Sequence, residues 1–198
     1  MSTFYKPIEK IEDWQVRLAD PNKHWRVGYS AMSLATCWHS ATGFPTEIKS
    51  TLDASAELAG AELLLAIPER QVDLPGGSRP SQSDLWALAR TPKDLLSIAV
   101  EGKVSEPFGP TVGEWLVDAS PGKLERLAYL QTQLGLEGTV PADIRYQLLH
   151  RTASAVIEAR RFHAARAVML VHSFSNSDSW IEDFLRFASL MGATADSG

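Results

Sequence analysis

Two apolar runs near the middle of the chain, separated by a short turn, have the pattern of strands buried in a sheet. The first begins at Asp84 and continues to Ala89, and the second extends from Leu95 to Val104. Residues 91–94 (TPKD) between them have turn chemistry, because proline presets the backbone angle of the second residue of a turn. Both runs are apolar on both faces, which is typical of central strands covered by helices on either side. The pattern therefore predicts a β-hairpin in the middle of a helix-flanked sheet.

The rest of the hydrophobic pattern predicts a single α/β domain over residues 1–198, with the core order helix, three strands, helix, strand. An irregular or helical lead-in (1–27) precedes this core, and a disordered tail (192–198) follows it. Pro68 is expected to bend or end the first strand, which residues 71–74 could extend. The expected helices are Ser30 (as N-cap) to 42, 45–52, 120–135, 141–162 and one opened by a Ser179–Glu182 capping box. The other expected elements are strands 62–67 and 165–174 and loops 75–83 and 105–113.

Three charged residues of the hairpin fall on one face of the sheet. In the register in which Arg90 faces Leu95, Asp84 lies directly opposite Glu101, so that their Cβ atoms are about 4.5–5.5 Å apart. Lys103 is two residues beyond Glu101 and projects from the same face. Charges at the end of buried strands are costly to desolvate unless they are paired or bind a metal. The patch is therefore either a metal site or a structural ion pair.

The arrangement Asp84 … Glu101-Gly102-Lys103 resembles the signature of the PD-(D/E)XK nuclease superfamily, although Ser83 stands where those proteins usually have proline. The wider chain is similar to a bacterial branch of that superfamily. The resemblance implies a restriction-endonuclease-like αβββαβ core and hydrolysis of phosphodiester bonds. It also implies Mg²⁺, or Mn²⁺, held by Asp84, Glu101 and the Gly102 carbonyl, with Lys103 orienting or activating the attacking water. Nucleic acid is the implied partner, and a homodimer is an implied assembly.

Two polar residues of the long helix 141–162 are candidates to support this site. Gln147 and Arg151 lie four residues apart along one edge of its apolar face, from which they can reach the end of the sheet. Relatives within the superfamily often present a glutamine from this helix. The alternative is that both residues only solvate the helix edge. Asp73 is the alternative first metal carboxylate should the register differ, and Glu47 or Glu57 could supply the helix glutamate that many members of the superfamily add to the metal site. Glu69 and Glu106 are further carboxylates close to the motif.

Composition and charge narrow the function classes. The chain is 44% hydrophobic and 22% charged, as soluble globular proteins are, and its single cysteine excludes an internal disulfide and suits a reducing cytoplasm. No apolar run approaches a membrane span, and the N-terminus lacks the apolar core of a signal peptide. We therefore expect a cytoplasmic protein without a membrane partner.

The net charge of −5 is unevenly distributed. Residues 144–166 contain five arginines and one glutamate, a local charge of +4. A nucleic-acid surface needs a basic patch and not a basic protein, so this segment is a candidate contact. The acidic balance nevertheless argues against strong duplex binding, which phosphate contacts dominate. The alternative for the segment is a solvated helical face.

The usual signatures of other chemistries are missing. The five histidines show no HxxxH or HExxH spacing, which argues against zinc, and no GxGxxG, GxxxxGK[ST] or GxSxG motif occurs. The leading hypothesis is a Mg²⁺-dependent nuclease. Two alternatives remain: a catalytically silent interaction module, favoured by a surface cluster of Trp14, Trp25 and Trp115, and a hydrolase of a small phosphorylated molecule, favoured by a closed pocket.

Overall fold

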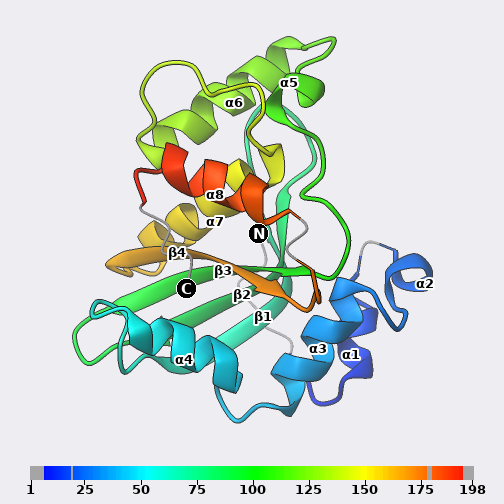
Figure 1. Ribbon diagram of the computed structural model, residues 1–198, viewed down its shortest axis with the longest axis vertical. Coiled ribbons are helices and arrows are strands. Elements are labelled where there is room, and N and C mark those ends of the chain that lie inside the picture. Colours follow the sequence, from blue (N-terminus) through cyan, green and yellow to red (C-terminus); the bar gives the residue numbers. More distant parts are fainter. Residues whose placement is uncertain (1–6, 19, 178–179, 194–198) are drawn as a thin grey trace.

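A four-stranded mixed sheet forms the centre of the molecule (Figure 1), and the structure, a computed structural model, describes residues 7–18, 20–177 and 180–193. The strands lie in the order β1-β2-β3-β4. The first three form an antiparallel meander, and the fourth is parallel to β3. The α/β class and the flanked mixed sheet predicted from the sequence are thus confirmed. The strands are β1 (Glu62–Val72), β2 (Ser81–Arg90), β3 (Leu95–Lys103) and β4 (Arg166–Ser173).

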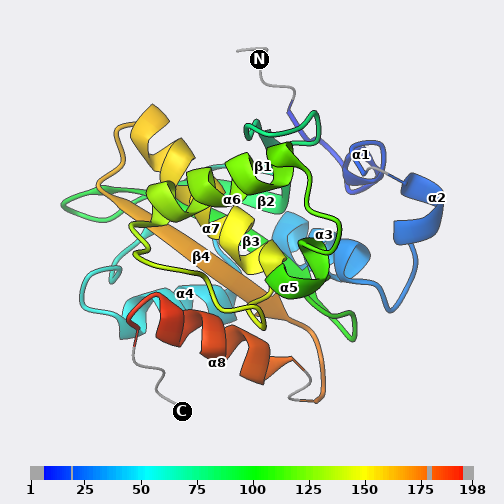
Figure 2. The ribbon, with the colours of Figure 1, turned by 90° about the horizontal axis from the view of Figure 1, so that it is seen from above.

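Helices cover both faces of this sheet, as the two views together show (Figures 1 and 2). On one face, α3 (Ser30–Ser40) and α4 (Thr46–Ala54) pack on the inward side chains of β2 and β3, together with Trp14 of α1 (Glu12–Gln15). On the other face, α7 (Tyr146–Arg161) lies directly on the sheet, and α6 (Pro121–Leu134) packs against α7. The remaining helices are α2 (Pro21–His24), α5 (Val112–Trp115) and α8 (Ile181–Leu190). The central strand β3 is consequently buried along almost its whole length.

The hairpin β2–β3 has the register expected from its turn. Arg90 pairs with Leu95, and the pairing continues without a shift to Leu85 and Val100. The turn is closed by a hydrogen bond of 2.8 Å from the Thr91 backbone N–H to the Asp94 carbonyl. Because the side-chain period of a strand is two, this register decides which side chains face α7.

Strand β1 continues through Pro68, where the sequence pattern suggested an end or a bend. Pro68 pairs with Leu85, and the pairing extends to Val72. Proline is tolerated here because β1 is an edge strand, on which a missing N–H need not break the sheet ladder. Strand β2 likewise begins at Ser81, inside the segment expected to be a loop.

Helix α7 begins at Tyr146 and not near residue 141, because the backbone before it is bonded elsewhere. The Ile144 carbonyl accepts the N–H of Val112 at 2.7 Å, and the Tyr146 N–H donates to Pro110 at 3.0 Å. The segment before α7 therefore pairs with the loop that follows β3. That loop also contains α5, a single helical turn with a Thr111–Glu114 capping box, which the sequence pattern did not predict.

Two predicted caps have different outcomes. Helix α6 has the expected Ser120 N-cap, and Gly135 ends it in the left-handed conformation. Helix α3 begins at Ser30 itself, with Tyr29 at the N-cap position and no side-chain cap, so the predicted Ser30 cap is wrong. Ser179 of the proposed capping box and residues 194–198 of the predicted tail lie outside the described residues.

Candidate active site

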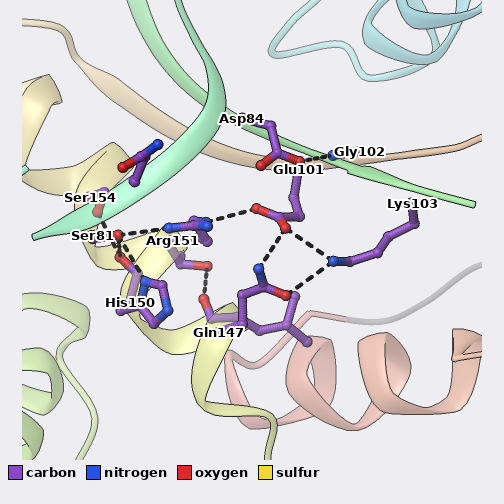
Figure 3. A network of polar contacts seen from close by, with 12 residues as sticks. Ser81, Asp84, Glu101, Gly102, Lys103, Gln147, His150, Arg151 and Ser154 are labelled. Carbon is purple, nitrogen blue, oxygen red and sulfur yellow. Dashed lines mark hydrogen bonds and ion pairs between the residues drawn. The ribbon is translucent and has the colours of Figure 1, made fainter. Parts of the chain in front are cut away.

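Asp84, Glu101 and Lys103 gather at the end of the sheet, on the face covered by α7 (Figure 3). Glu101 and Lys103 are only 2% and 7% exposed. Asp84 is half-buried on β2, and its Oδ2 accepts the backbone N–H of Gly102 at 2.9 Å. The antiparallel register of β2 and β3 brings the three side chains together. The structure thus forms the juxtaposition that the sequence predicted.

Helix α7 brings both predicted supporting residues to the same point. Gln147 donates to Glu101 Oε1 at 2.6 Å, and Arg151 Nε donates to Glu101 Oε2 at 2.7 Å. Lys103 Nζ donates to Glu101 Oε1 at 3.0 Å and to Gln147 Oε1 at 3.1 Å. Four residues separate Gln147 from Arg151, so one helical face carries both. Glu101 is therefore the centre of a fully bonded cluster (Figure 3).

The carboxylates of the cluster have opposite electrostatic environments. Burial raises the pKa of Asp84 well above its ordinary value, and the nearby charges of Glu101 and Glu69 add to this effect. Burial alone would raise the pKa of Glu101 as well, but the Arg151 guanidinium and the Lys103 ammonium outweigh it and lower the pKa overall. Glu101 is thus held as an anion, whereas the pKa of Asp84 is shifted in the direction of its protonated form.

Glu69 is a third carboxylate at this site, to which the sequence assigned no particular role. It lies on β1 between Pro68 and Arg70, whose partners on β2 flank Asp84. Its backbone has a φ of 54°, which is uncommon for a residue other than glycine, and Glu69 lines the same cavity as Asp84 and Glu101. Gln82 donates to its Oε2 at 2.5 Å. Burial raises the pKa of Glu69 to about 7, with Gln82 and Arg151 opposing the shift and Glu101 adding to it.

These residues line a cavity of about 810 Å³. Its other walls come from the N-terminal segment around Tyr29, from the first residues of α3, and from the loop after β3 (residues 105–109). Glu106 joins the three carboxylates at this wall. The residues that line the cavity do not include Asp73, Glu47 or Glu57, which were considered as alternative metal carboxylates.

A second polar cluster lies on the opposite face of the sheet. Cys37 Sγ and His172 Nε2 each lie 3.3 Å from Glu47 Oε1, and the three ligand atoms are within 4.8 Å of one another. The indole N–H of Trp38 donates to His172 Nδ1 at 3.1 Å, which places the ring proton on Nε2, the atom a metal would need free. The arrangement is therefore a hydrogen-bond network. Histidine spacing could not reveal it, because its members come from three separate elements.

The three tryptophans considered for a partner surface do not gather on the outside. Trp14 is buried and Trp25 packs against the same core cluster, while Trp115 stacks on Tyr146 in the other core cluster with a centroid separation of 4.0 Å. Within the described residues, no helix is long and apolar enough to cross a membrane.

Fold and site together define an α/β protein with a buried acid–base cluster at the end of a mixed four-stranded sheet. The chain belongs to the family described as Domain of unknown function (DUF6946), whose model matches residues 7–198. Comparisons with curated proteins and with solved structures found no match.

Proposed function

We propose that the protein is a metal-dependent hydrolase of phosphodiester bonds, a nuclease-like enzyme with a PD-(D/E)XK-type site. The observation that carries the proposal is the meeting of Asp84, Glu101 and Lys103 in one cavity with Gln147 and Arg151. The order of elements and the parallel pairing of β4 with β3 support the αβββαβ core that the resemblance implies.

The side chains present fit a hard divalent cation such as Mg²⁺ or Mn²⁺. Glu69, Asp84 and Glu101 offer oxygen atoms, the ligands these ions prefer. Gly102, whose carbonyl the resemblance adds as a ligand, lies between Glu101 and Lys103 on β3 but is not among the residues that line the cavity. Glu69, Asp84 and Glu101 line the cavity together with two cationic side chains, Lys103 and Arg151. Burial, and after it the charges of Glu101 and Glu69, raise the pKa of Asp84, and a bound cation would favour its ionised form. Glu101 Oε2 accepts one hydrogen bond, from Arg151, so this oxygen has a second lone pair for a cation.

The residues of the chain have separate tasks in the proposed reaction. Water attacks the phosphorus, the bond to the leaving oxygen breaks, and the proton of the water ends on that oxygen. A bound cation would polarise a phosphoryl oxygen and lower the pKa of the water. Lys103, as a cationic donor, would orient the water or offset charge that develops on the phosphoryl group. Gln147 and Arg151 hold Glu101 in place from α7.

Lys103→Met tests this assignment, with the exposed Lys93→Met as the matched control. The apolar stem is kept, and Glu101 retains Arg151 and Gln147 as partners, so the fold should survive and can be checked by circular dichroism. We expect Mn²⁺-dependent cleavage of a labelled oligonucleotide by the wild type and by the Lys93 variant, and loss of at least about 100-fold with Lys103→Met. Cleavage at the wild-type rate by the folded Lys103 variant would contradict the proposal.

A second candidate function is a catalytically silent interaction module with the same fold. It is favoured by the hydrogen bonds that Glu101 already accepts within the protein. Both of its oxygens already accept hydrogen bonds from side chains of the protein. In that case the cluster is a structural ion network, and neither Mg²⁺ nor Mn²⁺ would bind to it. Metal binding therefore separates the two candidates.

A further inference from the structure

The arginines of the basic segment 144–166 do not form a free phosphate-binding surface. Each of them has a partner within the described part of the chain. Arg145 pairs with Asp183 at 2.8 Å, Arg151 with Glu101 at 2.7 Å, and Arg161 with Glu158 at 3.0 Å. The others behave alike: Arg166 pairs with Glu57 at 2.9 Å, and Arg160 donates to Gln133. Four of the five arginines are therefore paired with a carboxylate of the chain, whereas the partner of Arg160 is neutral.

The cavity itself offers few positions for phosphate. The described residues that line it include one lysine, Lys103, and one arginine, Arg151, and both form ion pairs with Glu101. Four carboxylates line the same space: Glu69, Asp84, Glu101 and Glu106. Binding within a continuous strand relies on contacts to the phosphates on both sides of the reacting one. With one lysine and one arginine among four carboxylates, this cavity can bind a single phosphodiester together with a cation, but not several phosphodiesters in a row.

The far wall of the cavity supplies an aromatic side chain. Tyr29 lines the cavity and is 44% exposed, directly before α3. Figure 1 shows this N-terminal segment and the loop after β3 at the same end of the sheet. A volume of about 810 Å³ is within the range of pockets that enclose a small ligand. A ring at the wall of such a pocket can stack with a nucleobase of any sequence.

From these features we propose that the substrate is a phosphodiester with one nucleoside enclosed against Tyr29, presented by the end of a single strand or by a free dinucleotide. This inference rests on the proposed hydrolase function and restricts it. Phosphodiesters within a continuous or circular strand are excluded as substrates, because the phosphates on either side would then have to bind where the cavity has carboxylates.

The test compares three substrates with the same enzyme and Mn²⁺: a short linear single strand, the same strand ligated into a closed circle, and a dinucleotide. We expect cleavage of the linear strand or the dinucleotide, and cleavage of the circle at least about 10-fold more slowly. Cleavage of both the linear strand and the dinucleotide indicates that the enzyme acts on strand ends. Cleavage of the dinucleotide alone indicates that the substrate is a free small molecule. Equal cleavage of circle and linear strand would overturn the inference while leaving the hydrolase function intact.

Binding supplies a readout that does not depend on turnover. A fluorescent dinucleotide is titrated with Ca²⁺ present, and the Tyr29→Ala variant is compared with Val27→Ala, which changes a more exposed residue outside the cavity lining. Loss of stacking should weaken binding roughly five-fold or more for Tyr29→Ala and leave Val27→Ala unchanged. Binding without cleavage of any substrate would retain the pocket and reject the hydrolase; neither binding nor cleavage would reject both. Equal affinity of the two variants for the dinucleotide would show that Tyr29 does not stack on the nucleoside.

Discussion

At the scale of single residues, the site is a set of carboxylates whose protonation is set by burial and by one another. Glu101 is ionised by its cationic partners, whereas Glu69 and Asp84 are shifted towards their neutral forms. A shifted pKa is also a statement about stability, because the folded and unfolded chains then bind protons differently.

Glu69 should make the metal-free protein less stable as pH rises. Its pKa is about 7 in the folded chain against an ordinary 4.5, so the unfolded chain loses its proton first. The contribution of Glu69 to the free energy of unfolding, on the order of 3 kcal/mol, is fully present below about pH 4.5. It is lost as the pH rises to about 7. When urea unfolding is measured with a chelator present, the free energy of unfolding of Glu69→Gln should rise relative to that of the wild type by this amount between about pH 4.5 and 7. The exposed Asp73→Asn is the control; a constant difference between Glu69→Gln and wild type would contradict the account.

Cys37 should be an unreactive thiol. Burial, together with its hydrogen bond to Glu47, raises its pKa to about 11 from an ordinary 9.0. At pH 8 its thiolate is then about 100-fold scarcer than in an unshifted cysteine, and thiolate is the reactive form. Labelling with a thiol-specific disulfide reagent should be slower than that of glutathione by at least this factor, and urea should restore it. Labelling of the native protein at the glutathione rate would show that the Cys37–Glu47–His172 network is not formed.

The sequence could predict the residues that local periodicity places together. Asp84, Glu101 and Lys103 follow from the alternation of side chains in a hairpin, and Gln147 with Arg151 from the turn of a helix. The role of Glu69 could not be predicted in this way, because it depends on β1 continuing past Pro68 along the edge of the sheet. The Cys37 network depends on the packing of α3 and α4 against β4, which no local pattern encodes.

At the scale of elements, α7 is the support of the site. It lies on β2, β3 and β4, and its polar edge holds Glu101 from above. Helix ends could be predicted where their signals are local, as at Ser120 and Gly135 of α6. The start of α7 was predicted too early, because the backbone before Tyr146 pairs with the loop after β3, a long-range interaction.

The two helix residues that hold Glu101 should differ in their contribution to stability. Arg151→Met removes the ion-pair partner of a buried carboxylate and should cost about 3–5 kcal/mol in the free energy of unfolding. Gln147→Met removes a neutral donor and should cost about 1–2 kcal/mol, since Arg151 and Lys103 remain. Chemical denaturation at neutral pH measures both. An equal cost for the two variants would mean that Arg151 does not neutralise Glu101 in solution.

At the scale of the whole molecule, the arginines of the basic segment 144–166 and the lysine and arginine of the cavity already have partners within the described part of the chain. The α/β class and the order of elements were predictable, because they follow from periodic segments. The cavity was not, because it is enclosed in part by irregular segments, the N-terminal lead-in and the loop after β3, whose sequences carry no periodic signal.

Binding of single-stranded nucleic acid should consequently depend only weakly on salt. Since the cavity receives one phosphodiester, with Lys103 and Arg151 as its cationic side chains, log K should fall against log salt concentration with a slope of about −0.7. Fluorescence anisotropy over a series of salt concentrations measures the slope. A value several times steeper would indicate a basic surface elsewhere on the molecule and would contradict the restriction to one bound phosphodiester.

Calorimetric titration of Mn²⁺ and Mg²⁺, with and without a short oligonucleotide, tests the central claim most directly. The wild type is compared with the Asp84→Asn/Glu101→Gln double variant, and the oligonucleotide is included because substrate phosphate often completes a magnesium site. We predict saturable binding by the wild type that the double variant loses. Absence of binding by the wild type under both conditions would contradict the hydrolase and leave the cluster around Glu101 as a structural ion network.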